Sequence, residues 1–269
     1  MSVVTEMAKK MRIDIIEEIA AAGSGHPGGS LSVTDILAVL YFDKMNINPA
    51  DPKWEDRDRF VLSKGHVAPA LYAALAEKGY FDKEALKTLR KNDSFLQGHP
   101  DMKGTPGVDI STGSLGQGLS IANGMALAGR LNQKDYCVYV VLGDGEIQEG
   151  QVWEAAMSSA HYKLDHVIAF LDYNGLQIDG TNDEVMTVRP VDEKFRSFGW
   201  DVQVIDGHDC EAIAAAVDQA KKAEGKPSII ICNTVKGKGV SFMENEVGWH
   251  GTAPNAEQAE KALAELRNR

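Results

Sequence analysis

The sequence has few of the residues that stabilise small secreted domains. Its 269 residues include only three cysteines, Cys137, Cys210 and Cys232. They form no CxxC pair and lack the Cys/His spacing of a zinc site. Isolated thiols of this kind indicate buried free cysteines in a reducing compartment rather than a disulfide framework.

Long hydrophobic runs and basic residues are also scarce. No stretch reaches transmembrane length, and the start lacks the basic flank and long apolar core of a secretion signal, so we expect the cytoplasm. The chain has 28 Lys and Arg against 39 Asp and Glu, a net charge of -11. This balance argues against nucleic acid and anionic membranes as partners, although a metal could still invert the local field for a small anion.

The length and the 43% hydrophobic content are sufficient for a full core. We find no internal repeat and no interdomain linker, so residues 1–269 are predicted to form one domain. Within it we expect an amino-terminal helical segment, 1–58, and a carboxy-terminal helix, 256–269.

The stretch from Val138 to Gly180 is the most informative. Two apolar runs, 138–142 and 167–171, have the length and composition of buried strands, and a helix-like segment lies between them. Continuously apolar strands are typical of parallel sheets covered on both faces. The predicted fold class is therefore α/β, a parallel sheet with helices on both faces.

Polar residues follow both strands of this unit. Gly143-Asp144-Gly145 ends the first strand and Asp172-Tyr173-Asn174-Gly175 ends the second. If the strands are neighbours, these turns lie about 5 Å apart at the edge where α/β sheets bind ligands. A carboxylate would repel a phosphate, but a bound Mg²⁺ or Ca²⁺ removes that conflict, so the pattern favours a metal-bridged diphosphate.

The remaining chain repeats the alternation of strands and helices. Further strands are expected at 59–63, 200–205 and 228–235, and helices at 4–20, 68–78, 82–90 and 211–223. Ser32 and Asp35 have capping-box spacing, which predicts that a helix resumes after 30–32. The glycines between 104 and 129 predict close packing of the backbone against another helix or a ligand.

Four histidines lie beside glycine in predicted loops: His26, His66, His99 and His250. Each alone is more simply a solvated residue, but a group of four suits phosphorylated, polyhydroxylated ligands and proton transfer near neutral pH. His161 and His166 are predicted to be surface residues. His208 is interpreted as an ordinary loop residue at a strand end.

Several motifs together resemble the amino-terminal part of transketolases, which use thiamine diphosphate. They occur in the family's order along essentially the whole chain: SGHPGGSLS, SKGH, QGHP, STGSLGQGLS, GDGEIQEG, DYNGLQIDG and WHGTAP. The resemblance implies the diphosphate-type fold of thiamine-dependent enzymes. It also implies transfer of a two-carbon ketol unit from a ketose phosphate to an aldose phosphate, a reaction type of the pentose phosphate pathway.

The resemblance assigns site residues in groups. By similarity, Mg²⁺ would be held by Asp144, Asn174 and the carbonyl of Leu176. Contacts to thiamine diphosphate would come from His66, Gly113, Ser114, Leu115, Gly145, Asn174, Ile178 and His250. Sugar binding and proton transfer would involve His26, His99 and His250. Glu149 and Glu154 resemble acidic residues at the family's contact between active sites.

The chain departs from the family in length. Full transketolases continue with a pyrimidine-binding domain and a carboxy-terminal domain, and the glutamate that activates the aminopyrimidine belongs to that missing part. The resemblance therefore implies one subunit of a split transketolase. Its partner would be a carboxy-terminal subunit, with a heterotetramer of two plus two chains expected.

Two alternatives stay open at this point. The chain could be half of another thiamine-dependent ketose enzyme, similar to a deoxyxylulose phosphate synthase. It could also be a non-catalytic module that binds Mg²⁺ and a nucleotide.

Overall fold

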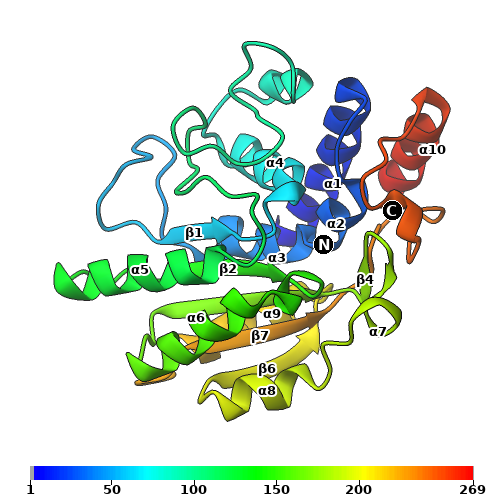
Figure 1. Ribbon diagram of the computed structural model, residues 1–269. Helices are drawn as coiled ribbons and strands as arrows, with labels where there is room; N and C mark the ends of the chain where they lie inside the picture. Colours follow the sequence, from blue (N-terminus) through cyan, green and yellow to red (C-terminus); the bar gives the residue numbers. More distant parts are fainter. Residues whose placement is uncertain (1–2, 269) are drawn as a thin grey trace.

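The computed structural model describes residues 3–268, and its centre is one five-stranded sheet (Figure 1). The strands are all parallel, in the order β1-β2-β3-β7-β6. They are β1 (Arg59–Leu62), β2 (Val138–Gly143), β3 (Val167–Tyr173), β6 (Asp201–Asp206) and β7 (Ser228–Asn233). The predicted fold class is confirmed, and β2 and β3 are neighbours as the sequence indicated.

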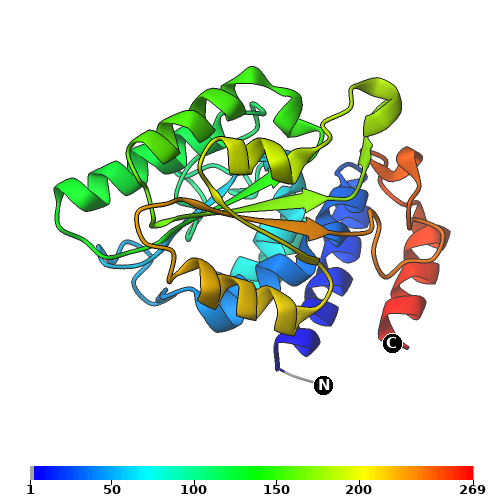
Figure 2. The ribbon, with the colours of Figure 1, turned by 90° about the horizontal axis from the view of Figure 1, so that it is seen from below.

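Helices cover both faces of the sheet (Figures 1 and 2). The first face carries α1 (Val3–Ala22), α3 (Thr34–Val39), α4 (Ala68–Lys78) and α9 (Cys210–Ala220), with α10 (Ala256–Arg267) packed on α1. The second face carries α5 (Gly118–Leu131), α6 (Gly150–His161) and α8 (Val191–Ser197). The predicted helix 256–269 thus reaches Arg267, and residue 269 lies outside the described residues.

Short elements complete the chain. They are α2 (Pro27–Ser32), the π-helix η1 (Leu40–Lys44), the 3-10 helices η2 (Gly65–Val67), η3 (Lys83–Thr88), η4 (Glu146–Gln148) and η5 (Val247–Trp249), the hairpin of β4 (Leu176–Gln177) and β5 (Gly180–Thr181), and α7 (Asn182–Val185). The hairpin and α7 directly follow the turn after β3.

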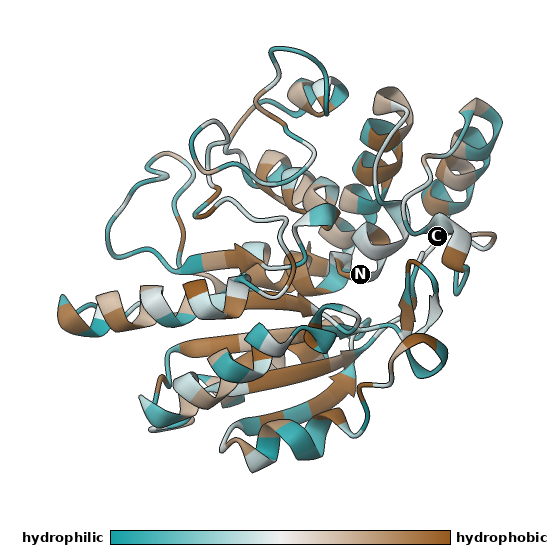
Figure 3. Ribbon diagram, in the orientation of Figure 1, coloured by the Kyte–Doolittle hydropathy of each residue, from teal (hydrophilic) through white to brown (hydrophobic). Residues whose placement is uncertain are grey.

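Side chains of the central strands alternate between two cores, because successive residues of a strand point to opposite faces. In β3, Ile168 and Phe170 belong to the core under α1, α3, α4 and α9, whereas Val167, Ala169 and Leu171 belong to the core under α5, α6 and α8. Figure 3 shows the resulting hydrophobic strands between the two helical layers. Burial on both faces explains why these strands are continuously apolar in sequence.

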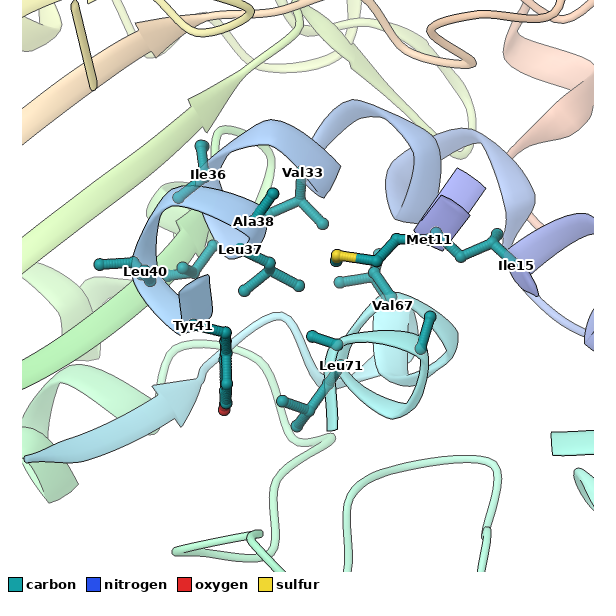
Figure 4. Close-up of a cluster of buried hydrophobic side chains, with 14 of the residues drawn as sticks. Met11, Ile15, Val33, Ile36, Leu37, Ala38, Leu40, Tyr41, Val67 and Leu71 are labelled. Carbon is teal, nitrogen blue, oxygen red and sulfur yellow. The ribbon is translucent and has the colours of Figure 1, made fainter. Parts of the chain in front are cut away.

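The first core joins α1, α3 and α4 with the start of the segment after β1 (Figure 4). Met11 of α1, Leu37 of α3 and Leu71 of α4 point toward one another and are at most 2% exposed. Val67 of η2 packs in the same cluster. The segment that carries His26 and the segment that carries His66 are therefore fixed on one rigid base.

One local expectation was wrong and another was met in part. Ser32 does not cap a helix, because α2 already begins at Pro27 and the Ser32 hydroxyl donates to the Gly29 carbonyl and to Asp172. The glycines of 113–118 do pack closely, on loop side chains and strand ends, and Gly116 also faces Gln151 in the first turn of α6. A Cβ on Gly118 would lie 2.3 Å from the Ser63 hydroxyl, and one on Gly116 would lie 2.8 Å from Glu149.

Within residues 3–268, no helix combines the length and the apolar character needed to cross a bilayer.

Helix α1 buries two carboxyl groups. Glu18 is 1% exposed and neither of its carboxyl oxygens has a hydrogen-bond partner within the described chain. Burial, with the nearby Asp14, raises the pKa of Glu18 well above its usual value. Burial also raises the pKa of Asp14 to about 7, although Lys83 lies 2.7 Å away. A raised carboxyl pKa means that the folded chain favours the protonated acid. The stabilisation that comes from protonating Asp14 and Glu18 is therefore complete below about pH 4 and is lost as the pH rises.

We predict that Glu18→Met raises the free energy of unfolding by about 1–3 kcal/mol at pH 8, because an unpartnered buried acid is replaced by an apolar side chain of similar length. The gain should shrink toward pH 4, and thermal unfolding at several pH values measures it. Glu17→Met, one residue away on the exposed side of α1, is the control and should change stability little. Equal gains at pH 4 and pH 8 would contradict the prediction.

Candidate functional site

A cavity of about 370 Å³ lies at the carboxyl edge of the sheet. Eleven of the residues singled out in the sequence line it: His26, His66, Gly113, Leu115, Asp144, Gly145, Glu149, Asn174, Leu176, Ile178 and His250. They come from the turns after β1, β2 and β3, from the start of α2, and from the loops before α5 and α10. The parallel sheet thus brings together residues that are more than 200 positions apart.

Asp144 and Asn174 lie on adjacent turns, because Gly143 of β2 pairs with Asp172 of β3. The Asp144 carboxylate accepts hydrogen bonds from the amide of Gly145 at 2.9 Å and from the amide of Gly175. The Asn174 amide oxygen accepts from the Leu176 amide at 3.1 Å. These bonds orient both side chains and tie the two turns to each other.

The oxygen donors of these turns suit a hard cation. Asp144 is 3% exposed, and burial together with the nearby Asp172 raises its pKa to about 6, so its anionic form is only partly compensated by the two amides and by Lys64. Each bonded oxygen keeps a further lone pair for a ligand. Within residues 3–268 no group of three or more His, Cys, Asp or Glu side chains could hold a metal ion. A cation here would instead use one carboxylate, one amide oxygen and the Leu176 carbonyl, a donor set compatible with Mg²⁺ that keeps phosphate oxygens as ligands.

Three imidazole rings meet on the other side of the cavity. The ring centroids of His26, His66 and His250 are 5.1 to 5.6 Å apart in every pair. Burial lowers the pKa of His26 to about 4 and that of His250 to about 3, and neighbouring cations add to both effects. Burial and Lys64 lower the pKa of His66 as well. All three rings are therefore neutral near pH 7 and can each donate and accept one hydrogen bond.

A buried lysine reaches into the same space. Lys236 is 2% exposed, and its ammonium lies 2.8 Å from His250 Nδ1 and 3.2 Å from the Leu176 carbonyl. Burial and the charge of Lys64 lower the pKa of Lys236 to about 8. Because an ammonium can only donate, His250 Nδ1 accepts and the ring proton is on Nε2. The Leu176 carbonyl, expected as a metal ligand, thus faces a cation in this structure.

Two buried carboxylates hold the turns around the cavity. Asp172 is fully buried and accepts from Lys64 at 2.6 Å, from Ser32 and from Thr234. Glu146 accepts from the amides of Gly116 and Gly143, each at 2.9 Å, and from the Ser63 hydroxyl. These carboxylates connect the turns after β1, β2, β3 and β7 with α2 and the 113–118 loop.

Other expected residues lie at the margin. His99 is not among the residues that line the cavity, but its ring packs on Gly113, where a Cβ would lie 2.9 Å from His99 Cδ2. Burial lowers the pKa of His99, with a contribution from Arg90. Ser114 is exposed beside it, Glu149 lines the cavity, and Glu154 is exposed on α6. His161 is exposed, as expected.

The sequence reasoning did not single out Lys64, Lys236, Glu146 or Asp172. A usable signal was present for the two lysines, because Lys64 follows β1 and Lys236 follows β7, at the same sheet edge as Asp144 and Asn174. The roles of the two carboxylates depend on partners 30 to 140 residues away and could not be derived from local pattern.

Comparison with known proteins agrees with this geometry. Residues 3–267 match the family described as "Transketolase, thiamine diphosphate binding domain". The 6-deoxy-6-sulfo-D-fructose transketolase subunit of Clostridium sp. (strain MSTE9) is 53% identical over 93% of this chain and 91% of its own. An apulose-4-phosphate transketolase subunit of Phocaeicola vulgatus is 44% identical, with 97% and 93% covered.

Longer relatives match over only part of their length. Human transketolase is 43% identical over 97% of this chain, which spans 41% of the human protein. The crystal structure of transketolase from Campylobacter jejuni superposes with a TM-score of 0.93 at 36% identity, covering 99% of this chain and 43% of that one. The fold, the cavity and these relatives agree, and the chain belongs to the transketolase family as its thiamine-diphosphate-binding domain.

Proposed function

We propose that this chain is the diphosphate-binding subunit of a two-chain, Mg²⁺-dependent transketolase. The observation that carries the proposal is the single cavity in which the oxygens of Asp144, Asn174 and Leu176 face three neutral histidines and a buried lysine. Oxygen donors on one side and nitrogen donors on the other suit a metal-bound diphosphate. The bound thiamine diphosphate would supply the carbon nucleophile that accepts the two-carbon unit.

The residues divide the binding between them. Asp144, Asn174 and the Leu176 carbonyl would hold Mg²⁺, or Ca²⁺ in its place. His66, the Gly145 amide, Asn174 and His250 would contact the diphosphate, and Lys236 would add a positive charge. His250 can donate from Nε2, because Lys236 occupies Nδ1. Gly113, Ser114 and Leu115 would lie along the pyrimidine, and Ile178 beside the thiazolium.

The sugar would meet His26, His99 and His250. Their pKa values are all lowered, so the rings stay neutral. His26 and His99 can each accept a hydroxyl proton at one nitrogen while donating from the other, whereas His250, whose Nδ1 accepts from Lys236, can only donate from Nε2. Neutral rings also avoid adding charge to a cavity that already holds Lys64 and Lys236.

A second chain would complete the site. Leu115 and Ile178, which line the cavity, are 39% and 63% exposed, and Val185 and Met186 beside them are also exposed. Apolar side chains exposed around a polar cavity are typical of a surface that another protein covers. That partner would be the carboxy-terminal transketolase subunit, in a two-plus-two assembly located in the cytoplasm, and it would supply the glutamate for the pyrimidine ring.

We predict that the purified chain alone catalyses no ketol transfer and gains activity when the partner subunit is added. Activity with a ketose phosphate donor and an aldose phosphate acceptor measures this, with the partner obtained by co-purification from native extract. Full activity of the isolated chain would contradict the split-subunit proposal.

We predict that Asp144→Asn weakens Mg²⁺-dependent binding of thiamine diphosphate at least about tenfold, because the variant loses the one anionic oxygen donor of the metal set. Titration calorimetry with Mg²⁺ present measures the affinity. Asp179→Asn removes an exposed carboxylate from the neighbouring hairpin and should leave it unchanged. An unaltered affinity in Asp144→Asn would remove Asp144 from the metal site. If the wild-type chain binds nucleotides instead of thiamine diphosphate, that result would support the alternative of a nucleotide-binding module.

A sulfonated ketose is a second candidate donor beside a ketose phosphate, because the relative that is 53% identical is named for 6-deoxy-6-sulfo-D-fructose. We predict measurable ketol transfer from this sulfonated ketose by the reconstituted two-chain enzyme. The ratio of kcat/KM for the sulfonated ketose and for a ketose phosphate decides between the two substrate classes. Activity with the ketose phosphate alone would exclude the sulfonated donor.

A further inference from the structure

His208 connects two segments that lie outside the cavity. It follows β6, and its ring lies between Asp35 of α3 and the backbone after β7. His208 Nδ1 is 2.7 Å from Asp35 Oδ2, and the Val235 amide donates to His208 Nε2 at 2.8 Å. The ring is thus held at both nitrogens.

The hydrogen bonds allow only one arrangement of the ring proton. A backbone N–H can only donate, so His208 Nε2 must be the unprotonated nitrogen and Nδ1 carries the proton toward Asp35. Arg12 fixes Asp35 in turn, through bonds of 3.0 Å and 2.5 Å to its two carboxyl oxygens. Burial alone would raise the pKa of Asp35, but Arg12 and His208 lower it, so Asp35 stays an anion that accepts from Nδ1.

The residue after Val235 is the buried Lys236 of the cavity. On its other side, the Gly237 amide donates to the Gly28 carbonyl at 2.9 Å, and a Cβ on Gly237 would lie 2.2 Å from the Met243 carbonyl oxygen. The backbone of Lys236 is therefore clamped by His208 before it and by Gly28 and Met243 after it. From this backbone position the Lys236 ammonium contacts both the Leu176 carbonyl and His250.

We propose that His208, oriented by Asp35 and Arg12, is a positioning residue that holds Lys236 at the diphosphate end of the cavity. The ligand contact of Lys236 rests on the proposed function, whereas the clamp on its backbone does not. The simpler alternative is that His208 only fastens the β6 loop to α3 and supports folding in general.

Three substitutions separate these roles, because side-chain amides mimic single imidazole nitrogens. His208→Gln places its amide near the Nε2 position and can still accept from the Val235 amide. His208→Asn places its amide near Nδ1, so it keeps the contact with Asp35 and loses the one with Val235. His208→Phe loses both, and His166→Phe, a partly exposed histidine at the opposite edge of the sheet, is the control.

The first measurement needs no ligand. Hydrogen exchange of the Val235 and Lys236 amides in the purified chain should accelerate about three- to tenfold in His208→Asn and His208→Phe. It should stay near wild type in His208→Gln and His166→Phe. Equal exchange in the Gln and Asn variants would overturn the proposal, and thermal unfolding of each variant separates a local change from general loss of stability.

The second measurement is calorimetric titration with thiamine diphosphate and Mg²⁺. The affinity should fall about three- to tenfold in His208→Asn but not in His208→Gln, and Lys236→Met should lower it at least as much. Wild-type affinity in His208→Asn, with weak binding in Lys236→Met, would overturn the positioning role. If the wild-type chain binds no thiamine diphosphate even with the partner subunit present, the proposed function fails, and the exchange measurement still decides the role of His208.

Discussion

The ion pair of Asp172 and Lys64 is the contact on which the cavity depends. The Asp172 side chain is fully buried and that of Lys64 is 3% exposed, so both charges have left water at a large cost in solvation free energy. That cost is offset only if the carboxylate's other lone pairs also accept hydrogen bonds. The hydroxyls of Ser32 and Thr234 donate these bonds to Asp172. One carboxylate therefore joins the ends of β1, β3 and β7 to α2, and the cavity residues of all four segments are placed by the same bond network.

The charges around the cavity are arranged in two groups. One group holds Asp144, a buried carboxylate with a raised pKa, and the other holds Lys236, a buried ammonium with a lowered pKa. Each shift marks a charge that burial destabilises and that a ligand of opposite sign would stabilise. A metal and a diphosphate bound together would supply both signs at once. The three neutral histidines can contribute hydrogen bonds without changing this balance of charge.

The sequence predicted the features that depend on periodicity and on strand ends. Continuous apolar strands indicated a parallel sheet, and the position of Asp144 and Asn174 after two of them placed these residues together. The same reasoning failed where side chains act across long separations. Ser32 and Asp35 have the spacing of a helix cap, but Ser32 bonds Asp172 and Asp35 pairs with Arg12 and His208. Both side chains therefore bind partners that are distant in sequence, although the local pattern predicted a helix cap.

Lys64 and Lys236 are both buried cations, but their hydrogen-bond partners differ in charge. Lys64 is neutralised by Asp172 within hydrogen-bonding distance. The bonds of Lys236 go to a carbonyl and to a neutral imidazole, while Asp144 and Asp172 act on it only through longer-range attraction. A buried ammonium held by neutral acceptors costs stability that a bound anion returns. Contacts on either side of Lys236, at the Val235 and Gly237 amides, fix its backbone beside the cavity. A bound anion would recover the free energy that burial costs at Lys236. This is the physical reason to expect an anion at this position.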